Sequence, residues 1–191
     1  MGANLSLLGV IGMVKAGDRD MALKDLVFDA AYDPASKKVT LKALSVESDW
    51  VTGVFTGELD AAAIMRGEQG AATPFKLSGL DVTLDIRPVF EKPWQFAHVD
   101  IEGALAADQQ KLTFSKLEAK TGELNASASG EVWLDSSGEA TQVGVKGQAL
   151  GTGRITPAQV LEFWPAGLSA GTREWVRERI TDGVATKAVF S

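Results

Sequence analysis

The sequence predicts a mainly β fold: a curled antiparallel meander sheet of about eight strands, forming a half-pipe or taco-like groove, followed by two short C-terminal helices. Three observations indicate this fold. A short apolar pattern recurs about every eighteen residues. Apolar and polar residues alternate within each copy, and turn-forming residues such as Asp33-Pro34 and Thr121-Gly122 separate the copies.

The repeated unit has two apolar residues two positions apart, a step of three positions, and two more apolar residues two apart. The copies are Met21/Leu23–Leu26/Phe28, Val39/Leu41–Leu44/Val46, Phe75/Leu77–Leu80/Val82, Trp94/Phe96–Val99/Ile101 and Leu112/Phe114–Leu117/Ala119. Residues two apart share a face of a strand, so each copy should have one apolar face. The step of three adds one residue to the alternation. We interpret it as a β-bulge, which bends a strand and increases its twist.

Longer alternating stretches assign side chains to faces. Leu80, Val82, Leu84 and Ile86 should share one face, as should the alternate residues from Leu124 to Leu134. Short connections between long strands predict antiparallel neighbours, and we expect about eight strands between residues 20 and 150. Residues 60–66 should form a short helix or a loop insertion.

Three regions follow from these patterns: a leading apolar segment at 1–19, the antiparallel β-repeat sheet at 20–150, and a helical segment with the start of a further strand at 151–191. The apolar run from Leu5 to Val14 is shorter than the ~20 residues of a membrane helix. No basic residue precedes it, as a signal peptide would require. We expect a buried first strand or a short helix there.

The C-terminal region carries helix signals. Thr156 is a good N-cap residue, Pro157 suits the first helical position, and Pro165 should stop that helix near Trp164. A second helix should begin between residues 169 and 172 and end at Gly183. Trp164 and Trp175 are expected to pack in the core, and residues 184–190 to begin another strand.

Composition excludes several classes of function. The chain has 191 residues, a net charge of −6 and no cysteine, and its single histidine is His98. The negative charge argues against a nucleic-acid partner. Without cysteine there is no thiolate metal site or cysteine nucleophile, and His98 lacks partners for catalysis or metal binding. We therefore expect a protein that is not an enzyme and has neither cofactor nor metal.

The size of the apolar face is the main functional clue. Eight strands of ~10–12 residues make a sheet face of roughly 1,300–1,500 Å². Three short helices would cover only roughly 350–450 Å² of it. The remainder exceeds the ~300–600 Å² apolar patch of an ordinary monomer. Either the sheet folds over on itself, or its face holds an apolar ligand.

The run from Phe163 to Gly183 resembles a motif of the AsmA-like envelope proteins of Gram-negative bacteria, of the YhdP and TamB type. The matching positions are Trp164, Pro165, Leu168, Arg173, Trp175, Val176, Ile180 and Gly183. Ala170 departs from the motif, which often has proline there. The match covers about 20 residues, and the strand repeats add a diffuse similarity.

The resemblance implies a segment of an inner-membrane-anchored periplasmic protein that bridges towards the outer membrane. Members of this family are thought to carry phospholipid acyl chains along a continuous hydrophobic β-groove. Other segments of the same full-length chain would then be partners of this one. We also expect self-association through an exposed edge strand of the excised sheet.

Two hypotheses remain open. In the first, the apolar face binds acyl chains; in the second, the chain is a structural or protein-interaction module whose sheet closes over a dry core. They differ in whether the interior of the sheet is open or filled. The candidate lipid-contacting residues are Phe28, Leu41, Val82, Leu84, Ile101, Phe114, Ala128, Val132 and Val145.

Overall fold

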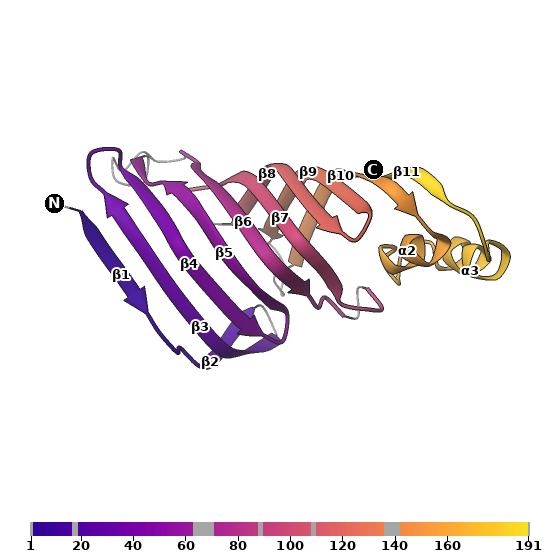
Figure 1. Cartoon of the computed structure of the whole chain (residues 1–191), viewed down its shortest axis with the longest axis horizontal. Helices are drawn as coiled ribbons and strands as arrows, with labels where there is room; N and C mark the ends of the chain where they lie inside the picture. The colour runs from indigo at the N-terminus through magenta and orange to yellow at the C-terminus, as the bar shows by residue number, and fades with distance from the viewer. Residues whose placement is uncertain are drawn as a thin grey trace.

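The structure, a computed structural model, describes residues 2–16, 19–62, 71–87, 90–107, 110–135 and 142–190. Its strands form a single antiparallel sheet (Figure 1). They are β1 (Ala3–Leu7), β2 (Gly12–Ala16), β3 (Arg19–Asp33), β4 (Lys38–Ser48), β5 (Val51–Asp60), β6 (Thr73–Leu84), β7 (Trp94–Leu105), β8 (Lys111–Thr121), β9 (Leu124–Asp135), β10 (Gln142–Ile155) and β11 (Ala185–Phe190). The helices are α2 (Pro157–Glu162) and α3 (Ala170–Arg179).

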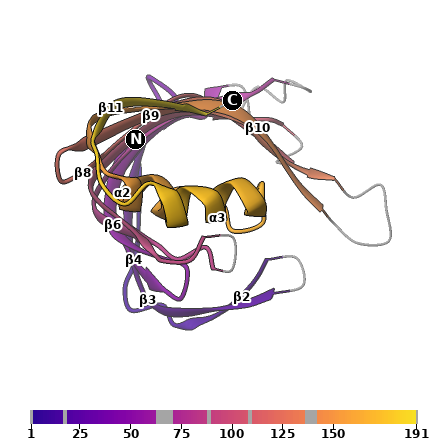
Figure 2. The same ribbon diagram turned by 90° about the vertical axis from the view of Figure 1, so that its right-hand side faces the viewer.

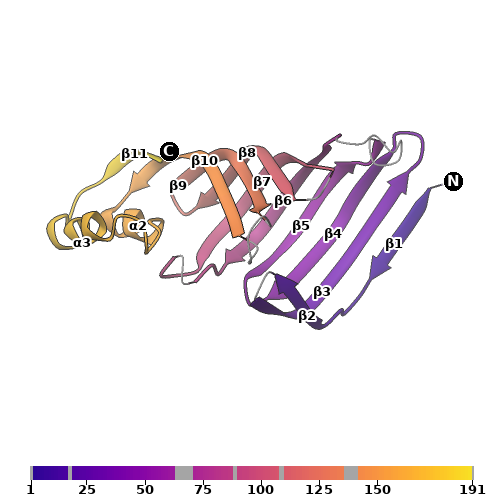
Figure 3. The same cartoon turned by 180° about the vertical axis from the view of Figure 1, so that it is seen from behind.

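The strands follow one another as a meander. From β3 to β10 each strand pairs with the next along the chain, which confirms the expected mainly β fold and its eight central strands. At one edge, β1 pairs with the second half of β3 and β2 with the first half. At the other edge β11 pairs with β10, as expected for the strand after the helices. The two edges lie at opposite ends of the molecule (Figures 1 and 3).

The sheet is strongly curled. Viewed along its long axis it forms an open arc, with α2 and α3 on the concave side (Figure 2). Register shifts between neighbouring strands occur at Leu23/Asp25, Leu41/Leu44 and Phe114/Leu117, where three of the repeat's three-residue steps lie. These shifts confirm the β-bulge interpretation at these positions and account for curvature, because a bulge bends its strand.

In β6 the predicted faces are partly wrong. Leu80 is 54% exposed and pairs with Val54 and His98 on the convex side, whereas Val82 is only 3% exposed. The change of face occurs between Gly79 and Val82, two residues later than the apolar pattern suggested. Asp81 has a φ of 50°, the left-handed backbone of an irregular residue in a strand.

The leading segment also differs from expectation. It forms β1 and β2, but its described apolar side chains, from Leu5 to Met13, are exposed: every residue of β1 is exposed, and Leu8 and Ile11, in the connection between the two strands, are 76% and 75% exposed. This segment lies at the edge of the sheet, where only β3 neighbours it, so fewer side chains pack against it. Of the expected insertion at 60–66, residues 63–66 lie outside the described residues.

The first C-terminal helix begins as predicted. Thr156 is the N-cap of α2, and its Oγ1 accepts a hydrogen bond from the N–H of Gln159. The Gln159 side chain in turn accepts from the N–H of Thr156, completing a capping box. Pro157 stands in the first turn, and the helix ends before Phe163.

The second helix begins within the expected window but is shorter than expected. It starts after Ser169 and ends at Arg179, with Ile180 as its C-cap, rather than at Gly183. Gly183 instead lies in the following turn with a φ of 129°, a conformation that favours glycine.

Candidate functional site

The concave apolar face is built from rows of directly opposed register positions, which share one face of the sheet. Register positions in one row contain only apolar residues from edge to edge: Leu5, Ala30, Leu41, Gly57, Leu77, Ile101, Leu117, Ala128, Ala149 and Phe190. A second, equally apolar row contains Leu7, Phe28, Leu44, Phe55, Gly79, Val99, Ala119, Ala126, Gly151 and Ala188. The face is therefore continuous perpendicular to the strands.

Glycines make room for aromatic rings on this face. A Cβ on Gly79 would lie 2.7 Å from the ring of Phe55, and one on Gly103 would lie 3.0 Å from the ring of Phe75. Each ring thus lies over a glycine of a neighbouring strand and flattens against the sheet. The apolar rows stay unbroken at these glycines because the ring fills the place of the missing side chain.

The convex face has the opposite chemistry. Oppositely charged residues face each other across neighbouring strands, as in Lys38–Glu58 at 3.0 Å and Lys76–Glu102 at 3.2 Å between side-chain nitrogen and oxygen. Such exposed pairs contribute little stability, about 0–1 kcal/mol each. Their effect is to make this face soluble. The two faces together define an amphipathic sheet.

The concave apolar face is only partly covered. No large side chain in the described part of the chain is fully buried, and Leu41, Leu77, Ile101 and Phe114 are half-buried. The accessible surface of the chain is 12,223 Å². A compact monomer of this size would expose only about 8,800 Å². The chain is therefore more open than a compact monomer, and the half-buried residues of the concave apolar face account for part of its exposed surface.

The best-packed part of the face lies at β6–β8. Val82, Phe96, Val99 and Ala119 form a buried cluster, and Phe163, at the end of α2, packs against it. The ring centroids of Phe163 and Trp94 lie 5.2 Å apart. The indole of Trp94 also donates to the carbonyl of Glu162 over 3.4 Å. These contacts seat α2 on the concave side (Figure 2).

A buried arginine fastens α3. Arg173 is 5% exposed; its guanidinium donates to Glu91 over 2.7 Å and to the carbonyl of Leu161 over 3.2 Å. Arg177 binds the same Glu91 oxygen at 3.0 Å. The hydrogen bond from Arg173 lowers the pKa of Glu91 below its ordinary value, and the charges of both arginines act in the same direction. Glu91 thus joins α3 to the loop before β7.

Most of the residues that resemble the AsmA-like motif lie in this α2–α3 unit. The indole of Trp164 donates to the carbonyl of Leu168 over 2.7 Å, and the N–H of Leu168 donates to the carbonyl of Pro165, so these three fix the turn between the helices. Arg173 is the buried clamp. Ala170 is the first residue of α3, a position that also suits proline.

The remaining motif residues lie mostly on the surface. The expectation of a core position is wrong for Trp175, which is 56% exposed, whereas Trp164 is half-buried. Ile180 is also exposed, and Val176 is half-buried. Trp175 is two residues from Arg173 along α3, and positions two apart on a helix point in different directions. Burying Arg173 therefore turns Trp175 outwards.

The structure brings the candidate lipid-contacting residues onto one face. Strand pairing places all nine at register positions of the concave side, from Phe28 in β3 to Val145 in β10. Val82 differs from the rest because it belongs to the buried cluster. The side chain of Val145 lies outside what the structure describes.

Sequence reasoning missed several residues of the face. Phe55, Leu77 and Leu117 occupy central row positions, but they were not among the candidates. Leu77 and Leu117 were already part of the repeated unit, and extending the candidates to every apolar position of each copy would have included them. Phe55 belongs to a weakly patterned strand, and only its pairing with Gly79 reveals its place.

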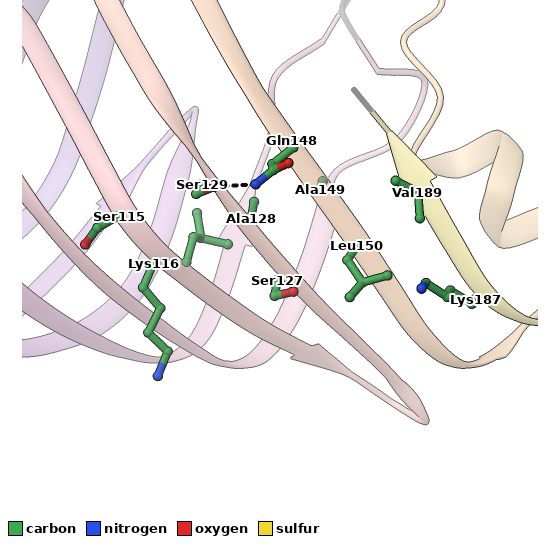
Figure 4. A pocket seen from close by; sticks show the side chains of 11 residues that line it. Ser115, Lys116, Ser127, Ala128, Ser129, Gln148, Ala149, Leu150, Lys187 and Val189 are labelled. Carbon is green, nitrogen blue, oxygen red and sulfur yellow. Dashed lines mark hydrogen bonds between the residues drawn. The ribbon is translucent and has the colours of Figure 1, made fainter.

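The convex face carries His98 and a polar hollow. His98 Nε2 lies 2.7 Å from Asp100 on that face, and no group of three metal-binding side chains occurs among the described residues. A hollow of about 410 Å³ over β8–β11 is lined mainly by small or flexible side chains (Figure 4). In it, Gln148 donates to Ser129 over 3.3 Å. Lys116 and Lys187 also line the hollow, which therefore offers hydrogen-bond donors and acceptors.

Neither described helix is long and apolar enough to cross a membrane. Compared with known proteins, the chain matches no family model, no curated protein and no solved structure.

Proposed function

We propose that the chain binds phospholipid acyl chains on its concave apolar face and serves as a segment of a hydrophobic groove for lipid transport. The observation that carries this proposal is the pair of uncharged rows that run from β1 to β11 and remain partly exposed. An accessible apolar surface of this extent is unfavourable in water. Covering it with hydrocarbon would remove that cost.

The dimensions suit acyl chains. Ten strand positions at ~4.8 Å spacing give a face about 45 Å long. One acyl chain spans about half of a ~30 Å bilayer core, so two or three chains fit end to end. Each methylene that leaves water stabilises the complex by about 0.8 kcal/mol. Binding therefore needs no charged headgroup pocket.

The family resemblance gives the proposal a cellular setting. The residues around Trp164, Arg173 and Gly183 resemble the motif of AsmA-like proteins. By analogy, we place the chain in the periplasm, as part of an inner-membrane-anchored protein that moves phospholipid towards the outer membrane. Other segments of that protein would continue the face at β1 and at β11, where the sheet has edges.

The alternative is a structural or protein-interaction module with a dry, closed core. In such a module, side chains would fill the interior of the sheet. The half-buried state of Leu41 and Ile101, and the large accessible surface, favour the lipid-binding proposal over it. A sheet closed over a dry core would leave no apolar face open to lipid, so the folded chain would bind none.

The test compares two charges on the same strand. Ile101→Asp places a carboxylate on the concave apolar face, while Gln95→Asp places one on the convex side of β7. Titration with cis-parinaric acid, a fluorescent fatty acid, should show roughly tenfold weaker binding for Ile101→Asp, because the charge loses hydration beside an alkyl chain. Gln95→Asp should bind as the wild type does.

Circular dichroism would establish that both variants fold. If folded Ile101→Asp bound the fatty acid as tightly as Gln95→Asp, the concave face would not be the binding surface. If the wild type did not bind at all, the proposed function would be wrong.

A further inference from the structure

A small cavity lies where α2 crosses the concave apolar face. It has a volume of about 100 Å³ and lies between α2 and strands β9, β10 and β11. Its floor is made of small residues, among them Ala126, Gly151 and Ala188, which stand side by side in one row of the sheet. Val160 and Phe163 form its roof on the helix side. The cavity therefore continues the face beneath α2.

The lining is almost entirely apolar. Gln159 is the one lining residue with a polar side chain. Its Oε1 accepts hydrogen bonds from the N–H and the Oγ1 of Thr156, at 2.8 and 3.1 Å, so this oxygen is already engaged in the helix cap. Leu124 and Ile155, each 4% exposed, close the inner wall. An apolar site with a single polar side chain cannot give a water molecule the roughly 2–4 polar partners that it needs, and therefore suits hydrocarbon.

The roof is held in place independently of the cavity. Phe163 packs on Trp94 and on the cluster of β6–β8, and Arg173 ties α3 both to Leu161 in α2 and to Glu91. The helix is therefore fastened on the side away from β9–β11. Space beneath it can be filled or emptied without breaking these contacts.

We propose that this cavity is a binding site for a single alkyl chain, which enters from the open face and passes beneath α2. The inference rests on the proposed function and makes it more specific: the open face would accept several chains, whereas the roofed end would accept one. The terminal methylenes of a fatty acyl chain would lie on Gly151, between Ile155 and Phe163.

Gly151 allows a direct test. A Cβ at this position would lie 3.5 Å from Ile155 Cδ1, 3.6 Å from Leu124 Cδ1 and 3.9 Å from Ala188 Cβ, all ordinary contacts. Gly151→Leu would therefore fill the cavity from its floor. Gly171→Leu is the matched control, since a Cβ on Gly171 in α3 meets nothing within 4 Å.

The probe is palmitic acid that carries a photoreactive diazirine near its methyl end, followed by peptide mapping. In the wild type we expect labelling of the peptide with Val160 and Phe163. Each excluded methylene changes affinity about fourfold, so Gly151→Leu should lower this labelling roughly fifteenfold if it displaces two. Gly171→Leu should label normally. If Gly151→Leu does not fold, Gly151→Ala, which adds one methyl, should lower the labelling about fourfold.

Two results would overturn the site while leaving the proposed function intact. One is labelling confined to β3–β8. The other is labelling of the Val160 peptide that persists in the Gly151 variants. Absence of labelling anywhere on the concave apolar face, in every variant, would contradict the proposed function and this site together.

Discussion

Individual positions on the concave apolar face differ in how much charge they tolerate. Val82 is 3% exposed and belongs to the buried cluster, whereas Ile101 packs at its margin and is half-buried. A carboxylate at Val82 would have neither water nor a cation to compensate it. The same change at Ile101 leaves the new charge partly hydrated.

Val82→Asp should therefore destabilise the fold by about 3 kcal/mol or more, enough to unfold a marginal domain. Thr83→Asp, on the next residue and the convex side, should cost less than about 1 kcal/mol. Urea denaturation followed by circular dichroism would measure both. Equal midpoints for the two variants would contradict the assignment of faces in β6.

At this scale the sequence predicted the correct face for most apolar residues, and the failure at Leu80 has a physical cause. The pattern detects side chains, and Gly79 has none, so the row position that Gly79 fills was assigned to Leu80 instead. The ring of Phe55 occupies the space above Gly79. A contact between neighbouring strands of this kind cannot be read from the spacing of residues along one strand.

Among the elements, the α2–α3 unit is attached by few contacts. Beyond the packing of Phe163 and the hydrogen bond from Trp94 to Glu162, its attachment depends on Glu91, Arg173 and Arg177. Elements with few buried contacts open at a lower free energy than the core. The unit should therefore detach before the sheet unfolds.

The lowered pKa of Glu91 makes this attachment pH-dependent. A carboxyl with a depressed pKa in the folded state stabilises that state above its unfolded pKa, near 4.5, and this contribution disappears as the pH falls through the folded value. The indole N–H of Trp94, which donates to Glu162, reports whether α2 is seated. Its NMR resonance should shift as the pH falls below about 4.5.

Glu91→Gln should weaken the attachment at neutral pH and remove most of this titration. Glu58→Gln, which breaks the exposed pair with Lys38 on the convex face, should leave the Trp94 resonance unchanged. If the resonance titrated equally in the wild type and in Glu91→Gln, another group would control the attachment of α2.

The sequence predicted where helices and bulges occur more reliably than it predicted which side chains are exposed. The Thr156-Pro157 start of α2 and several bulges depend on neighbouring residues, and the sequence revealed them. The exposure of Trp175 depends on Arg173, whose partner Glu91 is 82 residues away in the sequence. The exposure of residues 5–13 depends on their place at an edge. Neither the distant contact nor the edge position leaves a pattern in a short stretch of sequence.

The molecule as a whole is an open, curled sheet with two unpaired edges. The strand at one end is divided into β1 and β2, and at the other end β11 has only β10 beside it. Unpaired backbone groups at such edges favour pairing with further strands. We therefore predict that this chain self-associates through its edge strands.

The central claim is that the concave apolar face holds lipid. Native mass spectrometry of the purified chain, released gently from its buffer, tests this claim most directly. We predict adducts with the masses of phospholipids or fatty acids on the wild type, and their loss in the folded Ile101→Asp variant. A wild-type spectrum that showed only the bare chain, even after incubation with phospholipid vesicles, would contradict the account.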